Sequence, residues 1–344
     1  MNMTMASSKN AKDALSLVEG LQSYFVEKLD KLSFTIGENK KYEKVNWARD
    51  EGLHGGGSRY EARDKVLFNT ASVNVSQVHY DEMPHKNLKS ASAISTIIHP
   101  KNPNVPSIHI HISLTELRDG KIYWRIMADL NPSILNEEDK NTFEKSLKDL
   151  SGDNYTEGSL QGDKYFNIPA LNRHRGVSHF YLENYSSGDK NQDKTLAKSF
   201  GEGIIDTYIS IITNAFNTRQ EITQENMDKQ LEYHTLYLFQ VLTLDRGTTS
   251  GLLVHNQNDL GIMGSLPSFV NTRLLNSWAS LVSKPQDELV KSLALTLNDN
   301  GEVNENTKLK LAQVVRKHYV KHKDALALQA SGNTIPDTVN NHKK

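Results

Sequence analysis

SIHIHISLTELRDGKIYWRIMAD, residues 107–129, is the stretch that decides the fold of this 344-residue chain. In residues 107–116, isoleucine and leucine alternate with serine, histidine and threonine, a pattern typical of a strand with one buried and one polar face. Residues 121–129 alternate in the same way, and Asp119-Gly120 between the two runs favours a tight hairpin turn. The stretch therefore predicts two neighbouring antiparallel strands.

Further strands and helices are predicted on both sides of this hairpin. Runs with strand character occupy residues 66–78, 91–99, 177–184, 236–244 and 251–255. Helical patterns occupy residues 10–32, 137–150, 196–216, 224–232, 268–282, 286–297 and 306–330. Asn136 is expected to cap the second helix. These patterns predict an α+β fold, a large antiparallel sheet covered by helices in one domain over residues 1–330, with a disordered tail at 331–344.

The composition restricts the class of protein. The formal net charge is -1, so the whole chain has no electrostatic preference for nucleic acid or for an anionic membrane surface. The chain contains no cysteine, which excludes disulfides and thiolate sites and fits a cytoplasmic location. No apolar run approaches the roughly 20 residues of a membrane span, and the first 32 residues, which contain four acidic residues and no arginine, predict no targeting segment. We therefore expect no membrane insertion and no nucleic-acid partner.

The polar face of the first hairpin strand carries two histidines. His109 and His111 are two residues apart, so their side chains point the same way. Such a pair can bind a metal, act as acid and base, or simply lie on a face that meets water. The proline-rich connection HPKNPNVP, residues 99–106, leads directly into the pair and begins with another histidine, His99.

Two aspartates are expected at strand ends, where a carboxylate can face a cleft. Asp129 ends the second hairpin strand, and Asp245 ends the predicted strand 236–244. Each is a candidate to bind a ligand that is rich in hydrogen-bond donors, and each can instead cap a turn or pair with an arginine. Arg246 could neutralise Asp245 or bind a ligand carboxylate.

Other catalytic signatures are weak. The Gly-Gly-Gly-Ser-Arg run at residues 55–59 lacks the lysine and the spacing of a phosphate-binding loop. Neither a GxSxG motif nor an HExxH motif occurs.

The chain nevertheless resembles the oxygen-dependent coproporphyrinogen III oxidases. ISTIIHPKNPNVPSIH is similar to the HPxNPxxPTxH signature of that family and the strand before it. The segment ADLNPSILNEED resembles DLTPxYxxxED, and LDRGTTSGLL followed by SLP resembles DRGTxFGL and MSLP. Weaker matches are VNVSQVH and the RG that precedes HFYLEN. In chain order the matching segments are residues 73–79, 94–109, 128–139, 175–184, 244–253 and 265–267.

The resemblance implies a sheet flanked by helices on both faces, a homodimer and a tetrapyrrole substrate. It further implies conversion of two propionates of coproporphyrinogen III to vinyl groups, with molecular oxygen as co-substrate. No metal or organic cofactor is implied, and the residues that could bind a metal are His99 and His109. The implied catalytic residues are Asp245, which would hold pyrrole N–H groups, His109, an acid/base, and Asp129, which would support it. Ser95, Arg175 and Arg246 would contact substrate.

Several positions depart from the family pattern. His111 and Ser113 stand where the family has an asparagine and a propionate-binding arginine, and Asn258 stands where it has another arginine. Arg125 begins a run that is glycine-rich in the family. Because the substrate is polyanionic, we expect Arg125, Arg173 or His111 to replace the missing cations. The expected substrate-binding set is Ser95, His111, Ser113, Arg125, Arg175, Arg246 and Asn258.

Three functions are therefore considered. The first is oxidative decarboxylation of coproporphyrinogen III to protoporphyrinogen IX in haem synthesis. The second is the same fold acting on a different tetrapyrrole or electron-rich ring. The third is a tetrapyrrole-binding protein without turnover.

Overall fold

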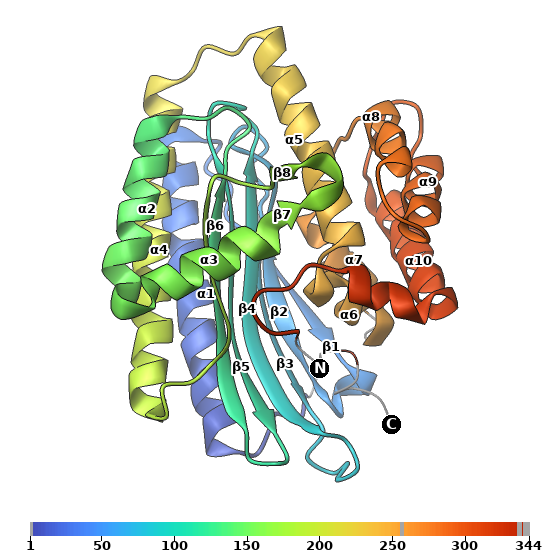
Figure 1. Cartoon of the computed structure of the whole chain (residues 1–344). Coiled ribbons are helices and arrows are strands. Elements are labelled where there is room, and N and C mark those ends of the chain that lie inside the picture. Colours follow the sequence, from blue (N-terminus) through green and yellow to red (C-terminus); the bar gives the residue numbers. More distant parts are fainter. Residues whose placement is uncertain (1–2, 255–257, 336–338, 340–344) are drawn as a thin grey trace.

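The centre of the computed structural model, which describes residues 3–254, 258–335 and 339, is a seven-stranded antiparallel sheet (Figure 1). The strand order is β1-β2-β3-β4-β5-β6-β9. The five predicted strands at 66–78, 91–99, 107–116, 121–129 and 177–184 are confirmed as β3, β4, β5, β6 and β9. The bounds are β1 (Glu43–Ala48), β2 (Gly55–Glu61), β3 (Phe68–His79), β4 (Leu88–Pro100), β5 (Ser107–Leu117), β6 (Ile122–Asn131) and β9 (Ser178–Tyr185).

The register of the central strands determines which side chains lie side by side. His109 of β5 lies opposite Asp129 of β6, and His111 of β5 lies opposite Ser95 of β4. Ile110, between the two histidines, belongs to the buried core on the other face. Because a shift of one residue would turn every side chain over, this alternation fixes both faces of the sheet at once.

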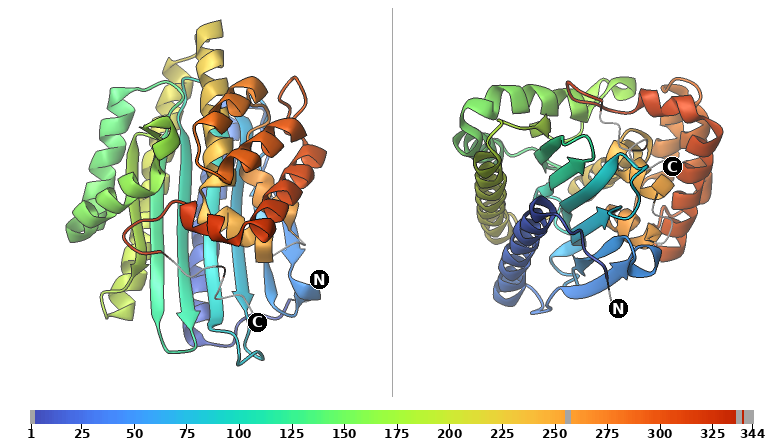
Figure 2. Two further views of the ribbon diagram at one scale, coloured as in Figure 1. Left: turned by 45° about the vertical axis from the view of Figure 1, so that its right-hand side comes forward. Right: turned by 90° about the horizontal axis from the view of Figure 1, so that it is seen from below.

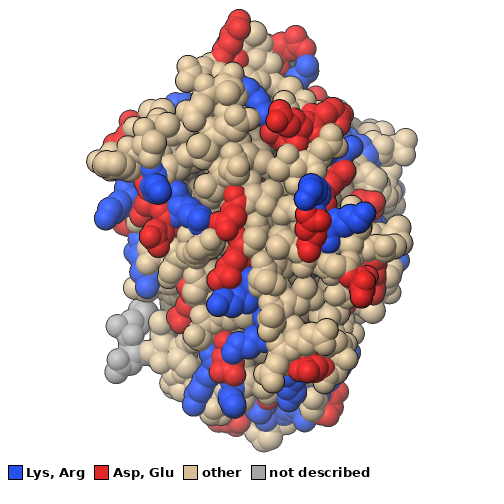
Figure 3. All heavy atoms as spheres, turned by 90° about the vertical axis from the view of Figure 1, so that its left-hand side faces the viewer, with Lys and Arg blue, Asp and Glu red and all other residues tan. Residues whose placement is uncertain are grey.

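One face of the sheet is covered by three long helices, α1 (Lys9–Ile36), α2 (Glu137–Ser151) and α4 (Lys190–Thr218) (Figures 1 and 2). Their apolar stripes and the isoleucines of β5 form one buried cluster. Asn136 caps α2 as predicted, since its side chain accepts a hydrogen bond from the backbone N–H of Asp139 at 3.0 Å. On the outer surface of this side, acidic and basic side chains are interspersed (Figure 3).

The other face carries a second buried cluster, built mainly by the C-terminal helices (Figure 2). These are α5 (Gln224–Thr243), α6 (Arg246–Val254), α7 (Asp259–Ile262), α8 (Thr272–Ser277), α9 (Gln286–Thr296) and α10 (Glu305–Lys321). Short 3-10 helices occupy Asp50–Gly52, Gly152–Asn154, Pro169–Leu171, Met263–Ser265, Trp278–Ser280 and Lys323–Leu328. No helix within the described ranges is long and apolar enough to cross a membrane. The sheet thus has helices on both faces, as expected.

Two strand predictions are wrong. Residues 236–243 belong to α5, and residues 251–254 belong to α6, while residue 255 lies outside the described residues. Residues 233–243 are all buried, so this part of α5 has no polar face. An apolar run without a polar face lacks the 3.6-residue period that distinguishes a helix from a strand.

Helix α3 (Tyr155–Phe166), which the sequence analysis did not predict, lies along β9 and leads into a small hairpin of β7 (Asn167–Ile168) and β8 (Arg173–His174). Two glycines allow this close approach. A Cβ atom at Gly158 would overlap the ring of Phe180, and one at Gly162 would crowd the backbone at His179. The glycines that weaken the helical pattern in the sequence are therefore needed for its packing.

The segment after the last 3-10 helix turns back toward α5 and α3. The backbone N–H of Ala330 donates to the carbonyl of Leu244 at 3.0 Å, and Gln329 donates to Thr249 at 2.6 Å. Gly332, inside the predicted tail, is buried beside Gln161. Residues 336–338 and 340–344 of that tail lie outside the described residues, and the single domain over residues 1–330 stays a prediction.

Substitution of Gly158 by alanine should destabilise the protein by about 1–3 kcal/mol, because the new methyl group forces α3 away from β9. Gly20, in α1, is the matched control, since no atom lies within 4 Å of its added Cβ. Gly20→Ala should stabilise by about 0.5–1 kcal/mol. Urea unfolding measures both. Equal shifts for the two variants would contradict the close packing of α3.

Candidate active site

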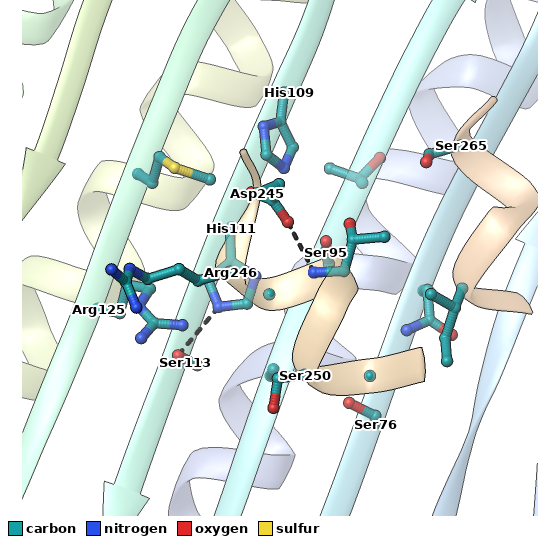
Figure 4. A pocket seen from close by; sticks show the side chains of 18 of the residues that line it. Ser76, Ser95, His109, His111, Ser113, Arg125, Asp245, Arg246, Ser250 and Ser265 are labelled. Carbon is teal, nitrogen blue, oxygen red and sulfur yellow. Dashed lines mark hydrogen bonds between the residues drawn. The ribbon is translucent and has the colours of Figure 1, made fainter. Parts of the chain in front are cut away.

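A cavity of about 310 Å³ lies between the polar face of the sheet and the segment from α5 to the 3-10 helix at Met263–Ser265. That volume is in the range of small-molecule sites. Figure 4 shows Asp245 and Arg246 facing side chains of the sheet. The cavity brings together most of the predicted site residues: Ser95, His109, His111, Ser113, Arg125, Asp245, Arg246 and Asn258.

The sheet supplies one wall through its alternating side chains. His109, His111 and Ser113 follow one another on the polar face of β5, and Ser95 projects from β4 beside them. The Nε2 atom of His111 lies 3.1 Å from the hydroxyl of Ser113. Burial, and then the positive charge of Arg125, hold the pKa of His111 well below its ordinary value. His111 is therefore neutral near pH 7 and is a hydrogen-bonding group, not a cation.

The helices supply the opposite wall, and this corrects the position expected for Asp245. Asp245 does not end a strand, because it lies between α5 and α6. One of its carboxylate oxygens accepts from the backbone N–H of Thr248 at 2.7 Å, and the other accepts from the hydroxyl of Tyr165 at 2.7 Å. The carboxylate is thus a cap of α6 and a cavity wall at once. Each oxygen retains a lone pair for a ligand N–H.

Arg246 begins α6 and lines the cavity beside Asp245. Its Nε donates to the carbonyl of Ala330 at 2.7 Å. Burial lowers its pKa below the ordinary value, although arginine remains charged. In the part of the chain that the structure describes, Arg246 forms no salt bridge.

Behind the cavity wall, His109 contacts a buried ion pair. The Nη2 atom of Arg175 lies 2.8 Å from Oδ2 of Asp129 and 3.1 Å from Nδ1 of His109. Oδ1 of Asp129 lies 3.2 Å from the same Nδ1 but has no hydrogen bond within the described residues. Nδ1 therefore accepts from Arg175, and in neutral His109 the hydrogen is on Nε2. When His109 is protonated, its Nδ1–H can instead donate a hydrogen bond to Oδ1 of Asp129, which stays ionised.

Neither member of this ion pair lines the cavity. Asp129 is 0% exposed and Arg175 is 1% exposed. Arg175 also donates to Gln240 at 2.7 Å, and its guanidinium lies 4.6 Å from the ring centre of Phe166. Burial raises the pKa of Asp129, but Arg175 and His109 outweigh burial and bring it to about 2. Asp129 and Arg175 are thus both charged. Arg175 was expected to contact substrate, but it contacts His109 instead.

The two arginines that were expected to replace the missing cations are each paired with a glutamate of the chain. Arg125, expected to bind a substrate carboxylate, lines the cavity and is paired with Glu183. Arg173 is half exposed, pairs with Glu232 at 2.7 Å and does not line the cavity.

His99 is fully buried and lies outside the cavity. Its Nδ1 is 3.0 Å from the hydroxyl of Ser107, and burial holds its pKa well below the ordinary value. Among the described residues, no group of three or more His, Cys, Asp or Glu side chains is arranged to hold a metal ion. The two candidate ligands have other partners, His99 with Ser107 and His109 with Arg175, and these contacts suit hydrogen bonding better than metal ligation.

Sequence reasoning missed four cavity-related residues. Tyr165 and Tyr181 line the cavity with ring centres 4.6 Å apart, and Tyr237 lines it from α5. Glu183 lies behind Arg125. Tyr181 and Glu183 could have been found, because the alternation in HFYLEN places both on one face of β9. Tyr165 could not, since its helix was not predicted.

The residues and their order match a known family. A family model described as coproporphyrinogen III oxidase matches residues 14–294. The chain belongs to the coproporphyrinogen III oxidase family. Among curated proteins, it is 26% identical over 315 residues to the rat protein named oxygen-dependent coproporphyrinogen-III oxidase, mitochondrial, and covers 64% of that protein with 83% of its own length.

Two more relatives extend the comparison. The human protein of the same name is 28% identical over an alignment of 251 residues, and the match covers 64% of this chain and 53% of the human protein. The fruit fly oxygen-dependent coproporphyrinogen-III oxidase is 29% identical over an alignment of 252 residues, and the match covers 66% of this chain and 64% of the fly protein. The chain therefore spans less than two thirds of the length of these members of the coproporphyrinogen III oxidase family.

The buried pair behind His109 predicts a specific pH dependence. Because the pKa of Asp129 is about 2 when folded, its ionisation stabilises the protein above about pH 4 by about 2 kcal/mol, and this is lost as the pH falls toward 2. Asp129→Asn leaves Arg175 unpaired and should cost about 3–5 kcal/mol at pH 7. The deficit should shrink by about 2 kcal/mol between pH 5 and pH 2, measured by urea unfolding. If the loss of stability in Asp129→Asn does not change with pH, the ionised form of Asp129 does not stabilise the fold in this way.

Proposed function

We propose that this chain catalyses the oxygen-dependent oxidative decarboxylation of coproporphyrinogen III to protoporphyrinogen IX in haem synthesis. The observation that carries the proposal is the cavity that the carboxylate of Asp245 and the imidazole of His109 line from opposite walls. Family membership and the names of the relatives support the choice of substrate.

The reaction needs groups that bind pyrrole N–H and move protons. A porphyrinogen is electron-rich, and a carboxylate that accepts or removes a pyrrole proton makes the ring a better reductant of oxygen. Asp245 has free lone pairs for this contact, and Tyr165 and the α6 backbone fix its orientation. His109 presents Nε2 to the cavity and can transfer a proton while Arg175 and Asp129 hold its other edge.

The balance of each step is simple. One propionate, one oxygen molecule and one proton give one vinyl group, one carbon dioxide and one hydrogen peroxide. The bond between the carboxylate carbon and the outer side-chain carbon breaks, a hydrogen leaves the side-chain carbon that is bonded to the pyrrole ring, and oxygen takes up two electrons. The chain's own residues bind the ring and supply the proton, and the proposal requires neither a metal nor an organic cofactor.

A second candidate is oxidation of a different tetrapyrrole or electron-rich ring. It is favoured because the cavity has few unpaired cations for a substrate with four carboxylates. Arg125 is already paired with Glu183, and Asn258 is neutral. Binding of a tetrapyrrole without turnover is the third. Products distinguish the three, because only the first gives loss of two carboxyl groups from coproporphyrinogen III.

Two further expectations, on oligomeric state and on cellular location, accompany the proposal. The homodimer is proposed from the family resemblance, and size-exclusion chromatography with light scattering measures it. A cytoplasmic location is proposed from the absence of cysteine, while the rat, mouse and human relatives are named mitochondrial.

Purified protein incubated with coproporphyrinogen III in air should produce protoporphyrinogen IX, detected by mass spectrometry, and should produce none without oxygen. Asp245→Asn should lower kcat about hundredfold or more, because the amide cannot accept the pyrrole proton. Asp149→Asn, at an exposed position on α2, is the control and should retain full activity. Unchanged turnover in Asp245→Asn would exclude the proposed role.

Treatment with a strong chelator followed by gel filtration should leave kcat within about twofold of the untreated value, because the proposed proton transfer uses only side chains. The rate and the bound metal, measured by elemental analysis, should be compared before and after treatment. Loss of turnover that returns on addition of one divalent metal would instead make the histidines of β5 candidate ligands.

A further inference from the structure

On the sheet wall of the cavity, the chain's own carboxylate holds Arg125. The Nε and Nη2 atoms of Arg125 donate to the two oxygens of Glu183 at 2.8 and 3.0 Å. The Glu183 side chain is 0% exposed, whereas that of Arg125 is 18% exposed. The hydroxyl of Tyr181 also donates to Glu183. One edge of the guanidinium is therefore occupied, and its remaining N–H groups are left for the cavity that Arg125 lines.

The contact is rigid as well as strong. Two parallel N–H···O bonds fix the plane of a guanidinium, and the buried hydroxyl of Tyr181 fixes the carboxylate in turn. Although burial alone would lower the pKa of Arg125, the charge of Glu183 raises it well above the ordinary value. Figure 4 shows Arg125 beside His111 and Ser113, so its position on the wall is set before a ligand arrives.

The charges that line the cavity are nearly compensated. Among the described residues, and apart from tyrosines, the ionisable residues that line it are His109, His111, Arg125, Asp245 and Arg246. Glu183 offsets Arg125, and Asp245 is the sequence neighbour of Arg246 and lines the same cavity. A carboxylate that leaves water needs a cation or several donors, or its desolvation is unfavourable. This cavity thus offers a carboxylate fixed donors with little net positive charge.

We propose that Arg125 binds one substrate carboxylate through the edge that Glu183 leaves free, and that Glu183 and Tyr181 are positioning residues that weaken and orient this contact. The inference rests on the proposed function, which supplies a substrate with propionates. A carboxylate that leaves as carbon dioxide loses any ion pair that it makes. Tight pairing would stabilise the substrate more than the transition state, so a compensated arginine keeps the site selective without holding the reacting group too firmly.

The test uses coproporphyrin III, the oxidised ring that the enzyme does not decarboxylate by the proposed route, and its tetramethyl ester. Both are titrated by fluorescence against the full-length protein. Glu183→Gln frees the charge of Arg125 and should lower the Kd for coproporphyrin III by about threefold to tenfold. Arg125→Met should raise it by about tenfold or more. The ester has no carboxylate, so neither Glu183→Gln nor Arg125→Met should change its Kd.

Turnover provides a second readout. Glu183→Gln should lower KM for coproporphyrinogen III and should not raise kcat, because the added affinity is for the ground state. A purely structural role of Glu183 would lower kcat or stability without improving binding. Tyr181→Phe removes one hydrogen bond to Glu183 but keeps its charge, so it should change the Kd by a smaller factor than Glu183→Gln.

Two control variants test whether the Kd changes come from the Arg125–Glu183 pair. Glu232→Gln removes the acidic partner of Arg173, an exposed arginine outside the cavity, and should leave every Kd unchanged. The double variant Arg125→Met/Glu183→Gln removes both charges, so it can fold without an unpaired buried ion. It should bind coproporphyrin III as weakly as Arg125→Met alone.

The inference is wrong if folded Glu183→Gln binds coproporphyrin III no better than the wild type, or if the ester responds equally. Its failure is distinct from failure of the proposed function. Turnover by the wild type with unchanged Kd values in the variants overturns the inference alone. Opposite Kd changes in the two single variants, without oxidation of any porphyrinogen by the wild type, overturn the proposed function alone.

Discussion

The strict alternation of apolar and polar residues in β5 is the constraint on which the rest of the structure depends. Its isoleucines complete the core beneath α1 and α4, so its histidines must face the other way. The register with β6 then brings His109 against Asp129 and Ser113 opposite Arg125. A slip of one residue would bury imidazoles in the core and remove the cavity wall. Folding and site formation are therefore the same event in this part of the chain.

Two buried carboxylates on this face show how the site uses charge. Asp129 is paired with Arg175 and is hidden behind His109, whereas Glu183 is paired with an arginine that reaches the cavity. Removing one partner of either pair would leave an ion with little hydration, which costs several kcal/mol. The first pair orients an imidazole, and the second orients a donor group. Both place a fixed charge close to the ligand without giving the cavity a large net charge.

The sequence predicts the structure well where apolar and polar residues alternate with the period of a strand or a helix, and poorly where they do not. The sheet from β3 to β6 and the cap at Asn136 carry clear local signals, and the structure agrees. Residues 236–243 are buried on every side, so they carry no period, and the strand prediction was wrong. Helix α3 contains Gly158 and Gly162, which lower helical propensity but allow close packing on β9. The partners of Arg125 and Asp245 lie 58 and 80 residues away, beyond any local pattern.

The shape of the cavity limits the ligand in a way that its charges do not. Ala91, Ala93 and Ser95 of β4 line it with small side chains, whereas Arg125 and Met127 of β6 are larger. Neighbouring strands lie about 4.8 Å apart, so a floor from β3 to β5 is about 10 Å wide. A flat and broad ring can lie over the small residues with one edge against β6. Breadth therefore favours a macrocycle, and the compensated charges restrict how many of its carboxylates are bound firmly within the cavity.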